Sequence, residues 1–156
     1  MVSGRQFTIE GEPMKDATLF RQAMGALQYL TNTRPDIAFS VNKLSQYMSS
    51  PTMEYWQGIK RIFRYIQGTI DHCLHIKPST NLDITGFSDA NWATSIDDRK
   101  SIAGHCVFLG ETLVSWSSRK QKVVSRSSTE SEYRALADLA TEITWTCSLM
   151  QELKFP

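Results

Sequence analysis

The chain has 156 residues, a formal net charge of +1 and 41% hydrophobic residues. This length suits one ordinary domain or two very small units that share a core. The apolar content, with four Trp, excludes an intrinsically disordered chain. The near-neutral charge excludes a global field that attracts nucleic acid or membrane, so any basic surface must be local.

The sequence predicts an intracellular protein with no membrane partner. It has no run of about 18 apolar residues, and its first residues lack a signal-peptide core. Cys73, Cys106 and Cys147 are odd in number, widely spaced and placed in apolar segments. We therefore expect buried, reduced thiols and no disulfide framework. The sequence does not separate nucleus, cytoplasm and organelle.

The first half of the chain is predicted to be helical. Residues 1–17 carry two Gly and one Pro and are expected to form a tail or linker. From residue 18 to residue 70, apolar residues recur at three- and four-residue steps and predict three amphipathic helices. Phe20 and Leu27 are expected to face inward in the first helix, near 18–31. Short turns with Pro join the helices, which indicates a small antiparallel bundle.

The turns of this bundle carry capping signals. Thr33 is expected to cap the second helix, with Pro35 in its first turn and Asp36 completing a Thr-x-x-Asp pattern. Thr52 is expected to cap the third helix. The inward residues of the third helix are predicted to be Tyr55, Ile59, Ile62, Phe63 and Ile66.

After residue 70 the pattern changes to short apolar segments, which predicts strands. We expect a short strand at 72–76 and then an antiparallel meander of strands at 82–87, 102–109 and 113–117. A long helix closes the chain. Its buried stripe is predicted to be Leu136, Ala140, Ile143, Cys147 and Met150, with Leu139 beside them. The fold class is therefore α+β.

Asp89 lies two residues after the end of the predicted strand 82–87, in the segment GFSDANW. Metal-dependent phosphoryl-transfer enzymes place a Mg²⁺ ligand at such a position, because the strand holds the carboxylate rigidly. The alternative is a turn residue that bonds to the local backbone, which is the commoner role of Asp after a strand. The segment by itself favours the turn.

Glu132 lies where the last helix is expected to begin. Thr129-x-x-Glu132 fits a capping box, and Ser127-x-x-Glu130 offers the same device earlier in the chain. The functional alternative sets Glu132 on the first turn of the helix, facing the end of strand 82–87. There its carboxylate could share a divalent ion with Asp89. The pattern alone favours the cap.

Four motifs then occur in a fixed order. They are GALQYL at 25–30 with TRPDIA at 33–38, KRIFRYIQGT at 60–69, FSDANWA at 87–93 with DRKS at 98–101, and SWSSRKQ at 115–121 with SSTESEYRAL at 127–136. With these motifs the chain closely resembles the C-terminal part of copia-type retrotransposon polyproteins, plant elements above all. The resemblance covers nearly all of residues 20–153.

The resemblance implies a reverse transcriptase thumb- or connection-like segment at 18–70 and a truncated ribonuclease H-like domain at 71–156. In that family, water activated between two Mg²⁺ ions held by carboxylates cuts the RNA of a hybrid. The resemblance therefore implies that Asp89 and Glu132 are catalytic residues and metal ligands, and makes Glu130 the less favoured ligand. The cofactor would be Mg²⁺ or Mn²⁺ in an active protein, and otherwise none.

The chain departs from the family pattern at its end. The family has, after this helix, a fourth strand with an Asp-Asn pair, further helices and a late His-x-Asp segment, and the sequence ends before them. Two of four expected carboxylates thus have no counterpart. We expect a catalytically incomplete fragment that binds nucleic acid, such as an RNA/DNA hybrid, or protein. The alternative is an active metal-dependent ribonuclease H that cuts RNA in RNA/DNA hybrids.

Local basic and aromatic residues indicate where nucleic acid, hybrid or single-stranded, would bind. The candidates are Lys60, Arg61, Arg64, Trp116, Arg119, Lys120, Lys122 and Arg126. Solvated faces are the alternative explanation for these residues. The strand at 82–87, without a second neighbour, would leave an exposed sheet edge, which favours a protein partner or self-association. A zinc site at His72, Cys73 and His75 is disfavoured, because no further ligand pair accompanies them.

Overall fold

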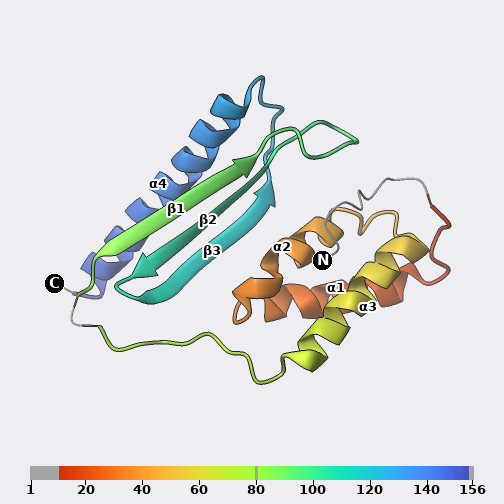
Figure 1. The fold of residues 1–156 in the computed structure, drawn as a ribbon, viewed down its shortest axis with the longest axis horizontal. Helices are drawn as coiled ribbons and strands as arrows, with labels where there is room; N and C mark the ends of the chain where they lie inside the picture. The colour runs from red at the N-terminus through yellow and green to blue at the C-terminus, as the bar shows by residue number, and fades with distance from the viewer. Residues whose placement is uncertain (1–10, 80, 155–156) are drawn as a thin grey trace. The chain divides into compact units, whose positions relative to one another are not determined.

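Four helices and three antiparallel strands make up the part of the chain that the structure describes, residues 11–79 and 81–154, in a computed structural model (Figure 1). The predicted α+β class is confirmed. The chain divides into two compact units, one up to Leu74 and one from His75 onwards. Of the expected tail at 1–17, residues 1–10 lie outside the described residues.

The first unit contains the three predicted helices, α1 (Ala17–Leu30), α2 (Pro35–Ser45) and α3 (Met53–Gly68). Their apolar stripes meet in one core. Its buried residues are Phe20, Met24, Leu27, Ile37, Val41, Leu44, Tyr55, Ile59 and Ile62. The inward positions of Phe20 and Leu27 are thus confirmed. The inward prediction for Phe63 is wrong, because one residue turns a helix by about 100° and Phe63, next to Ile62, remains 42% exposed.

The helix starts in this unit differ from the predicted caps. The N-cap of α2 is Arg34 and not Thr33, because Asp36 is taken by the Arg34 guanidinium through bonds of 3.0 and 2.8 Å. Arg34 is buried and also donates to the carbonyl and hydroxyl oxygens of Thr69 at the end of α3, at 3.1 and 2.8 Å. Thr52 is the N-cap of α3, as predicted, but its side chain makes no capping bond.

The second unit contains β1 (Ile84–Asn91), β2 (Ile102–Leu109) and β3 (Thr112–Lys120), paired in the antiparallel order β1-β2-β3, and α4 (Ser128–Glu152). The predicted meander is confirmed. The strand predicted at 72–76 is wrong: in the described residues this segment has no ladder partner and most of its side chains are exposed. β1 starts two residues later than predicted and continues to Asn91, so Asp89 lies inside the strand.

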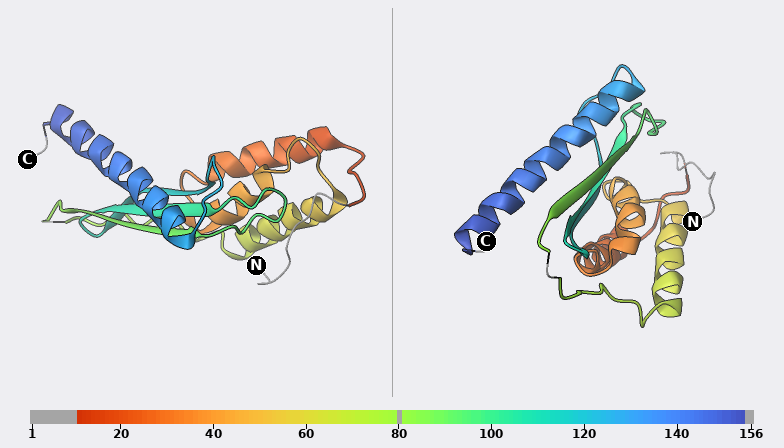
Figure 2. Two further views of the ribbon diagram at one scale, coloured as in Figure 1. Left: turned by 90° about the horizontal axis from the view of Figure 1, so that it is seen from above. Right: turned by 60° about the vertical axis from the view of Figure 1, so that its left-hand side comes forward.

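α4 runs along one face of the sheet, as Figure 2 shows. Its buried residues are Ser131, Ala135, Leu139 and Thr146. The stripe predicted from Leu136 to Met150 is wrong at three positions: Leu136 is 52% exposed, and Ala140 and Cys147 are exposed too, whereas Ile143 and Met150 are half-buried. Leu139, predicted beside the stripe, faces the sheet together with the small side chains of Ser131 and Ala135, which let the helix approach the strands closely.

The cysteines also differ from expectation. They are free thiols, as predicted, but Cys73 and Cys147 are exposed and Cys106 is half-buried. The prediction of buried thiols is wrong, because Cys73 lies in the extended segment after α3 and Cys147 on the exposed side of α4.

Candidate functional site

One face of the sheet packs against α4, and the other face carries Asp89. A Cβ atom added at Gly86 would lie 2.7 Å from Leu139 and 2.8 Å from Ile143, so Gly86 faces α4. Ala90 packs with Ala103 and Ala135 on the same face. Because side chains alternate along a strand, Asp89 lies on the opposite face, where it is exposed.

Asp89 is held by the strand and not by a turn. Its backbone pairs with Gly104 of β2. Phe87 lies two residues earlier on the same face and packs edge-on against Phe108, with 6.2 Å between the ring centres. The turn interpretation of Asp89 is therefore wrong. The position keeps the carboxylate in water on a rigid support, which is compatible with a metal ligand.

The cap of α4 uses Glu130 and leaves Glu132 out. The hydroxyl oxygen of Ser127 accepts from the Glu130 amide at 3.1 Å, and Glu130 accepts from the Arg126 amide at 2.8 Å and from Arg134 at 2.8 Å. These bonds, the Arg126 amide first, hold the pKa of Glu130 below its usual value. The Thr129–Glu132 capping box is therefore wrong, and the earlier Ser127–Glu130 pair takes its place.

Glu132 is exposed on α4 directly after its first turn, not on that turn as predicted, and lies beside β1. It lines a shallow depression with Ser88 of β1 and with residues of its own helix. Ser88 directly precedes Asp89 in the chain but points to the α4 side of the sheet, so the two candidate carboxylates approach the end of β1 from different faces.

These two carboxylates do not complete a metal site by themselves. Within residues 11–79 and 81–154, no three His, Cys, Asp or Glu side chains are grouped closely enough to hold a metal ion. Mg²⁺ prefers six oxygen ligands in near-octahedral geometry, and a two-metal centre needs several bridging carboxylates. Asp89 and Glu132 would leave most of that coordination to water and to groups outside the described residues.

The basic residues predicted to bind nucleic acid are divided between surfaces. Arg119 lies opposite Ala103 on the α4 side of the sheet, whereas Trp116 and Lys120 point to the other side. The ammonium group of Lys120 is 3.1 Å from an Asp98 oxygen, so it is not free for phosphate. Lys122 and Arg126 are exposed on the β3–α4 connection.

The other three basic candidates belong to the first unit. Lys60, Arg61 and Arg64 are exposed on α3. The Lys60 ammonium lies 5.8 Å from the centre of the Trp56 ring, a cation–π contact that keeps an aromatic face beside the charges. This pairing of charge and aromatic ring is typical of surfaces that bind single strands.

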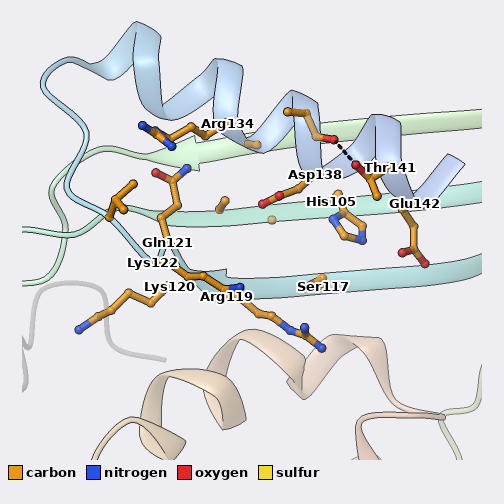
Figure 3. Close-up of a pocket in the computed structure, with 15 residues that line it drawn as sticks. His105, Ser117, Arg119, Lys120, Gln121, Lys122, Arg134, Asp138, Thr141 and Glu142 are labelled. Carbon is orange, nitrogen blue, oxygen red and sulfur yellow. Dashed lines mark hydrogen bonds between the residues drawn. The ribbon is translucent and has the colours of Figure 1, made fainter. Parts of the chain in front are cut away.

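A cleft of about 630 Å³ lies between α4 and the β3 side of the sheet (Figure 3). Arg119 and Lys122 line it from the end of β3, and Asp138 and Glu142 line it from α4. Its floor includes His105 of β2. Sequence reasoning missed this cleft. The sequence does carry one signal of it. Ser117 and Arg119 are two residues apart, so they lie on the same face of the strand, and both are polar although a helix was expected to cover that face.

A buried polar network ties the start of α4 to the end of β1. The amide nitrogen of the Gln121 side chain donates to the Ser131 carbonyl at 2.9 Å, and the Ser125 hydroxyl donates to the Gln121 side-chain oxygen at 3.0 Å. The Trp92 indole donates to the Ser125 carbonyl at 3.0 Å. Gln121, Ser125 and Ser131 are all buried. The network therefore fixes where Glu132, next to Ser131, sits relative to β1.

The β1–β2 connection is fixed by Asp98, which pairs with Lys120 of β3 at 3.1 Å and with Lys100 at 3.7 Å. Burial disfavours the charged form of Asp98 and by itself would raise its pKa. Hydrogen bonds from Ser95, Lys120 and the Lys100 amide outweigh this effect and lower the pKa to about 2.

The sequence of this chain is similar to those of three proteins. The Retrovirus-related Pol polyprotein from transposon RE2 of Arabidopsis thaliana is 48% identical over 92% of this chain and 10% of its own length. The Pol polyprotein from transposon TNT 1-94 of Nicotiana tabacum is 36% identical over 94% of this chain and 11% of its own. The Secreted RxLR effector protein 161 of Plasmopara viticola is 41% identical over 81% of this chain and 89% of its own.

The chain is homologous to a segment of copia-type retrotransposon Pol polyproteins. It spans about a tenth of the length of the polyproteins named here. The match to RE2 covers 143 residues and is longer than either unit, so it includes both. No family model and no solved structure matches the chain. In the described part, no helix has the length and apolar character needed to cross a membrane.

Proposed function

We propose that this copia-type Pol segment binds nucleic acid, an RNA/DNA hybrid or a single strand, and does not cut it on its own. The second unit would be the opening part of a ribonuclease H-like domain. The observation that carries this proposal is the placement of Asp89 on β1 and of Glu132 near the start of α4, beside β1. The first unit would be a reverse transcriptase thumb- or connection-like segment.

Binding would depend on Arg119, Lys122 and Arg126, which are exposed near the start of α4. Each can neutralise a backbone phosphate and release counterions. Asp138 and Glu142 line the same cleft from α4 and disfavour phosphate beside them, so phosphate contacts would lie on the β3 side of the cleft. In the first unit, Lys60, Arg61 and Arg64 would add phosphate contacts, with Trp56 as a stacking surface.

The lack of cutting rests on the metal ligands. Two carboxylates are too few for a two-metal centre, and no cluster of three potential ligands occurs in the described residues. Mg²⁺ or Mn²⁺ would bind weakly at Asp89 or Glu132, mostly through water. When a complete site holds the metals, they activate the attacking water. Here Asp89 and Glu132 would supply part of the coordination.

A second candidate is an active ribonuclease H. Glu132 favours it, because the cap of α4 uses Glu130 and leaves the Glu132 carboxylate exposed beside β1. In this case the missing ligands would come from residues outside the described part or from a second chain.

The binding proposal is tested by fluorescence anisotropy of a labelled hybrid titrated with the full chain at two salt concentrations. We expect affinity to fall steeply with salt and to vary little with sequence. Arg119→Ala with Lys122→Ala and Arg126→Ala should lower the slope of log affinity against log salt by about 3, roughly one for each phosphate that is no longer neutralised. Lys77→Ala, also an exposed lysine of the second unit, is the control and should leave the slope unchanged. No binding at low salt would contradict the proposal.

A further inference from the structure

The cleft between α4 and β3 results from the way the helix packs on the sheet. α4 lies over β1 and β2, so the same face of β3 lies beside the helix and not beneath it. The cleft is on the β3 flank of α4, away from the outer edge of β1 (Figure 3). Its floor is formed by β2 and β3, which pair with each other along their lengths.

Asp138 lies in the middle of the helix side that lines this cleft. Arg134, Asp138 and Glu142 follow one another at steps of four residues and so share one side of α4. Arg134 donates to Glu130 at 2.8 Å, and Glu142 accepts from the Ser115 hydroxyl at 2.6 Å. Among the described residues, Asp138 has no hydrogen-bond or ion-pair partner. Its carboxylate is therefore available to a ligand in the cleft.

The opposite wall of the cleft carries positive charge. Arg119 lies on the α4 face at the end of β3, and Lys122 follows it in the β3–α4 connection. Both line the cleft and are exposed. Within the described part of the chain, neither forms an ion pair with Asp138 or with another carboxylate. The cleft thus holds two cations and one carboxylate on facing walls, all unpaired within the described residues.

The surface between these walls suits a flat, uncharged ring system. Ala103 and Ala135, both buried, line the cleft, as does Val123. His105 of β2 lies in the floor below Asp138 (Figure 3). Unpaired nucleic-acid bases stack on His and on other flat or apolar side chains. The volume of about 630 Å³ lies within the range of about 300–1,000 Å³ that is usual for small-ligand sites.

The charges of the two walls restrict the class of ligand. Asp138 repels a purely anionic ligand, and Arg119 and Lys122 repel a purely cationic one. A nucleotide has a phosphate at one end and an uncharged base with N–H donors at the other. An ionised carboxylate only accepts, through two oxygens. Guanine offers it two adjacent donors, N1–H and the N2 amine, which match the two oxygens as the fork of an arginine does.

We propose that this cleft binds one guanine nucleotide, with the base donating to Asp138 and the phosphate contacting Arg119 and Lys122. A free nucleotide and an unpaired residue of a bound strand share this chemistry. For a strand as the source, the inference rests on the proposed function, and for a free nucleotide it does not. In a fully paired hybrid the N1–H and N2 amine of guanine are used in pairing, so binding of such a hybrid stays independent of sequence.

The first test follows the amide NMR signals of Ser117 and Thr141, which line the cleft, in the isotope-labelled full chain. Guanosine monophosphate, inosine monophosphate and guanosine are titrated separately. We expect guanosine monophosphate to bind about tenfold more tightly than inosine monophosphate, which lacks the N2 amine. Guanosine, which lacks the phosphate, should also bind more weakly than guanosine monophosphate.

Variants assign the two ends of the nucleotide. Asp138→Asn leaves one acceptor oxygen where there were two, so the preference for guanosine monophosphate over inosine monophosphate should disappear. Glu152→Gln removes a carboxylate from the same helix outside the cleft and should keep the preference. Lys122→Ala should weaken binding of guanosine monophosphate and leave that of guanosine unchanged, because it removes a phosphate contact. Circular dichroism checks that the variants fold.

A strand as the source of the nucleotide is tested by fluorescence anisotropy. Two labelled hybrids carry one unpaired residue at the end of one strand, with guanine in one hybrid and hypoxanthine, the base of inosine, in the other. We expect the unchanged chain to bind the guanine overhang more tightly. Asp138→Asn should bind the two overhangs equally. A preference among the free nucleotides but not between the overhangs would support the site with a free nucleotide as its ligand.

Equal binding of guanosine and inosine monophosphates by the unchanged chain, or no binding of either, would overturn the proposal. A preference that persists in Asp138→Asn would overturn it too, because another group would then contact the base. Hybrid binding without nucleotide binding would overturn this inference and leave the proposed function standing. Nucleotide binding without hybrid binding would support the cleft and contradict the proposed function.

Discussion

Leu139 of α4 lies so close to Gly86 of β1 that a Cβ atom at Gly86 would be 2.7 Å from its Cδ1 atom. Gly86→Ala forces both Leu139 and Ile143 to move, and Leu139 is buried. We expect the second unit to lose about 1–3 kcal/mol of unfolding free energy, which is typical of overpacking. Urea unfolding measures it.

Gly104→Ala is the comparison for this substitution. A Cβ atom added at Gly104 would have one neighbour within 4 Å, the backbone oxygen of Ser117 at 3.3 Å. The loss of stability should be clearly smaller than for Gly86→Ala. Equal losses would mean that close approach of α4 to β1 is not what requires glycine at position 86.

Arg34 joins the start of α2 to the end of α3. Arg34→Lys keeps the charge but removes the two-pronged interaction with Asp36 and a bond to Thr69. We expect the first unit to lose about 1–3 kcal/mol of unfolding free energy, because the buried Arg34 side chain loses hydrogen bonds to a carboxylate. Arg61→Lys on the exposed side of α3 should change little. Hydrogen exchange of the α2 and α3 amides measures the stability of the first unit separately from that of the second unit. Unchanged exchange in Arg34→Lys would contradict a stabilising role for Arg34.

Asp98 should make the second unit sensitive to acid. Its pKa is lowered to about 2 in the folded chain, so its contribution to stability is complete above the unfolded pKa of about 4 and is lost as the pH falls towards about 2. Asp98→Asn should lower the unfolding temperature at neutral pH and flatten its dependence on pH in that window. Thermal unfolding of both proteins from about pH 5 to pH 2 measures this. If the unfolding temperatures of the two proteins fell in parallel with pH, Asp98 would not be the source of the acid sensitivity.

The cap of α4 can be tested by two neighbouring hydroxyls. Ser127→Ala removes the acceptor for the Glu130 amide and should cost about 0.5–2 kcal/mol. Thr129→Ala should have little effect, because Thr129 is not the N-cap. Urea unfolding compares the two. If Thr129→Ala were the more costly change, Glu132 would have a capping role after all.

Periodicity predicted the four helices and the three-stranded meander, but it also predicted a strand at 72–76 that does not form, and it did not show which side of α4 is buried. The Leu136–Cys147 stripe is the more hydrophobic side, yet Ala135 and Leu139 face the sheet. Burial there follows the fit to Gly86, a long-range contact that no local pattern encodes. The more hydrophobic stripe lies on the flank beside β1.

The candidate carboxylates were found from the sequence, but their surroundings were not. Asp89 was expected after a strand and lies inside one, because pairing with β2 extends β1 to Asn91. Two capping boxes fitted the start of α4 equally well, and only the fold shows that Glu130 is used. The Gln121 network was missed, because Gln and Ser in a polar segment are typical of loops and give no sign of burial.

The central claim is that this chain binds hybrid and does not cut it alone. The most direct test incubates an RNA/DNA hybrid with the full chain and Mn²⁺, beside Asp89→Asn and Glu132→Gln, with binding recorded in the same samples. We predict binding by all three proteins and no cleavage by the unchanged chain above the level of the variants. Cleavage that both substitutions abolish would contradict the claim and show that the remaining metal ligands are present.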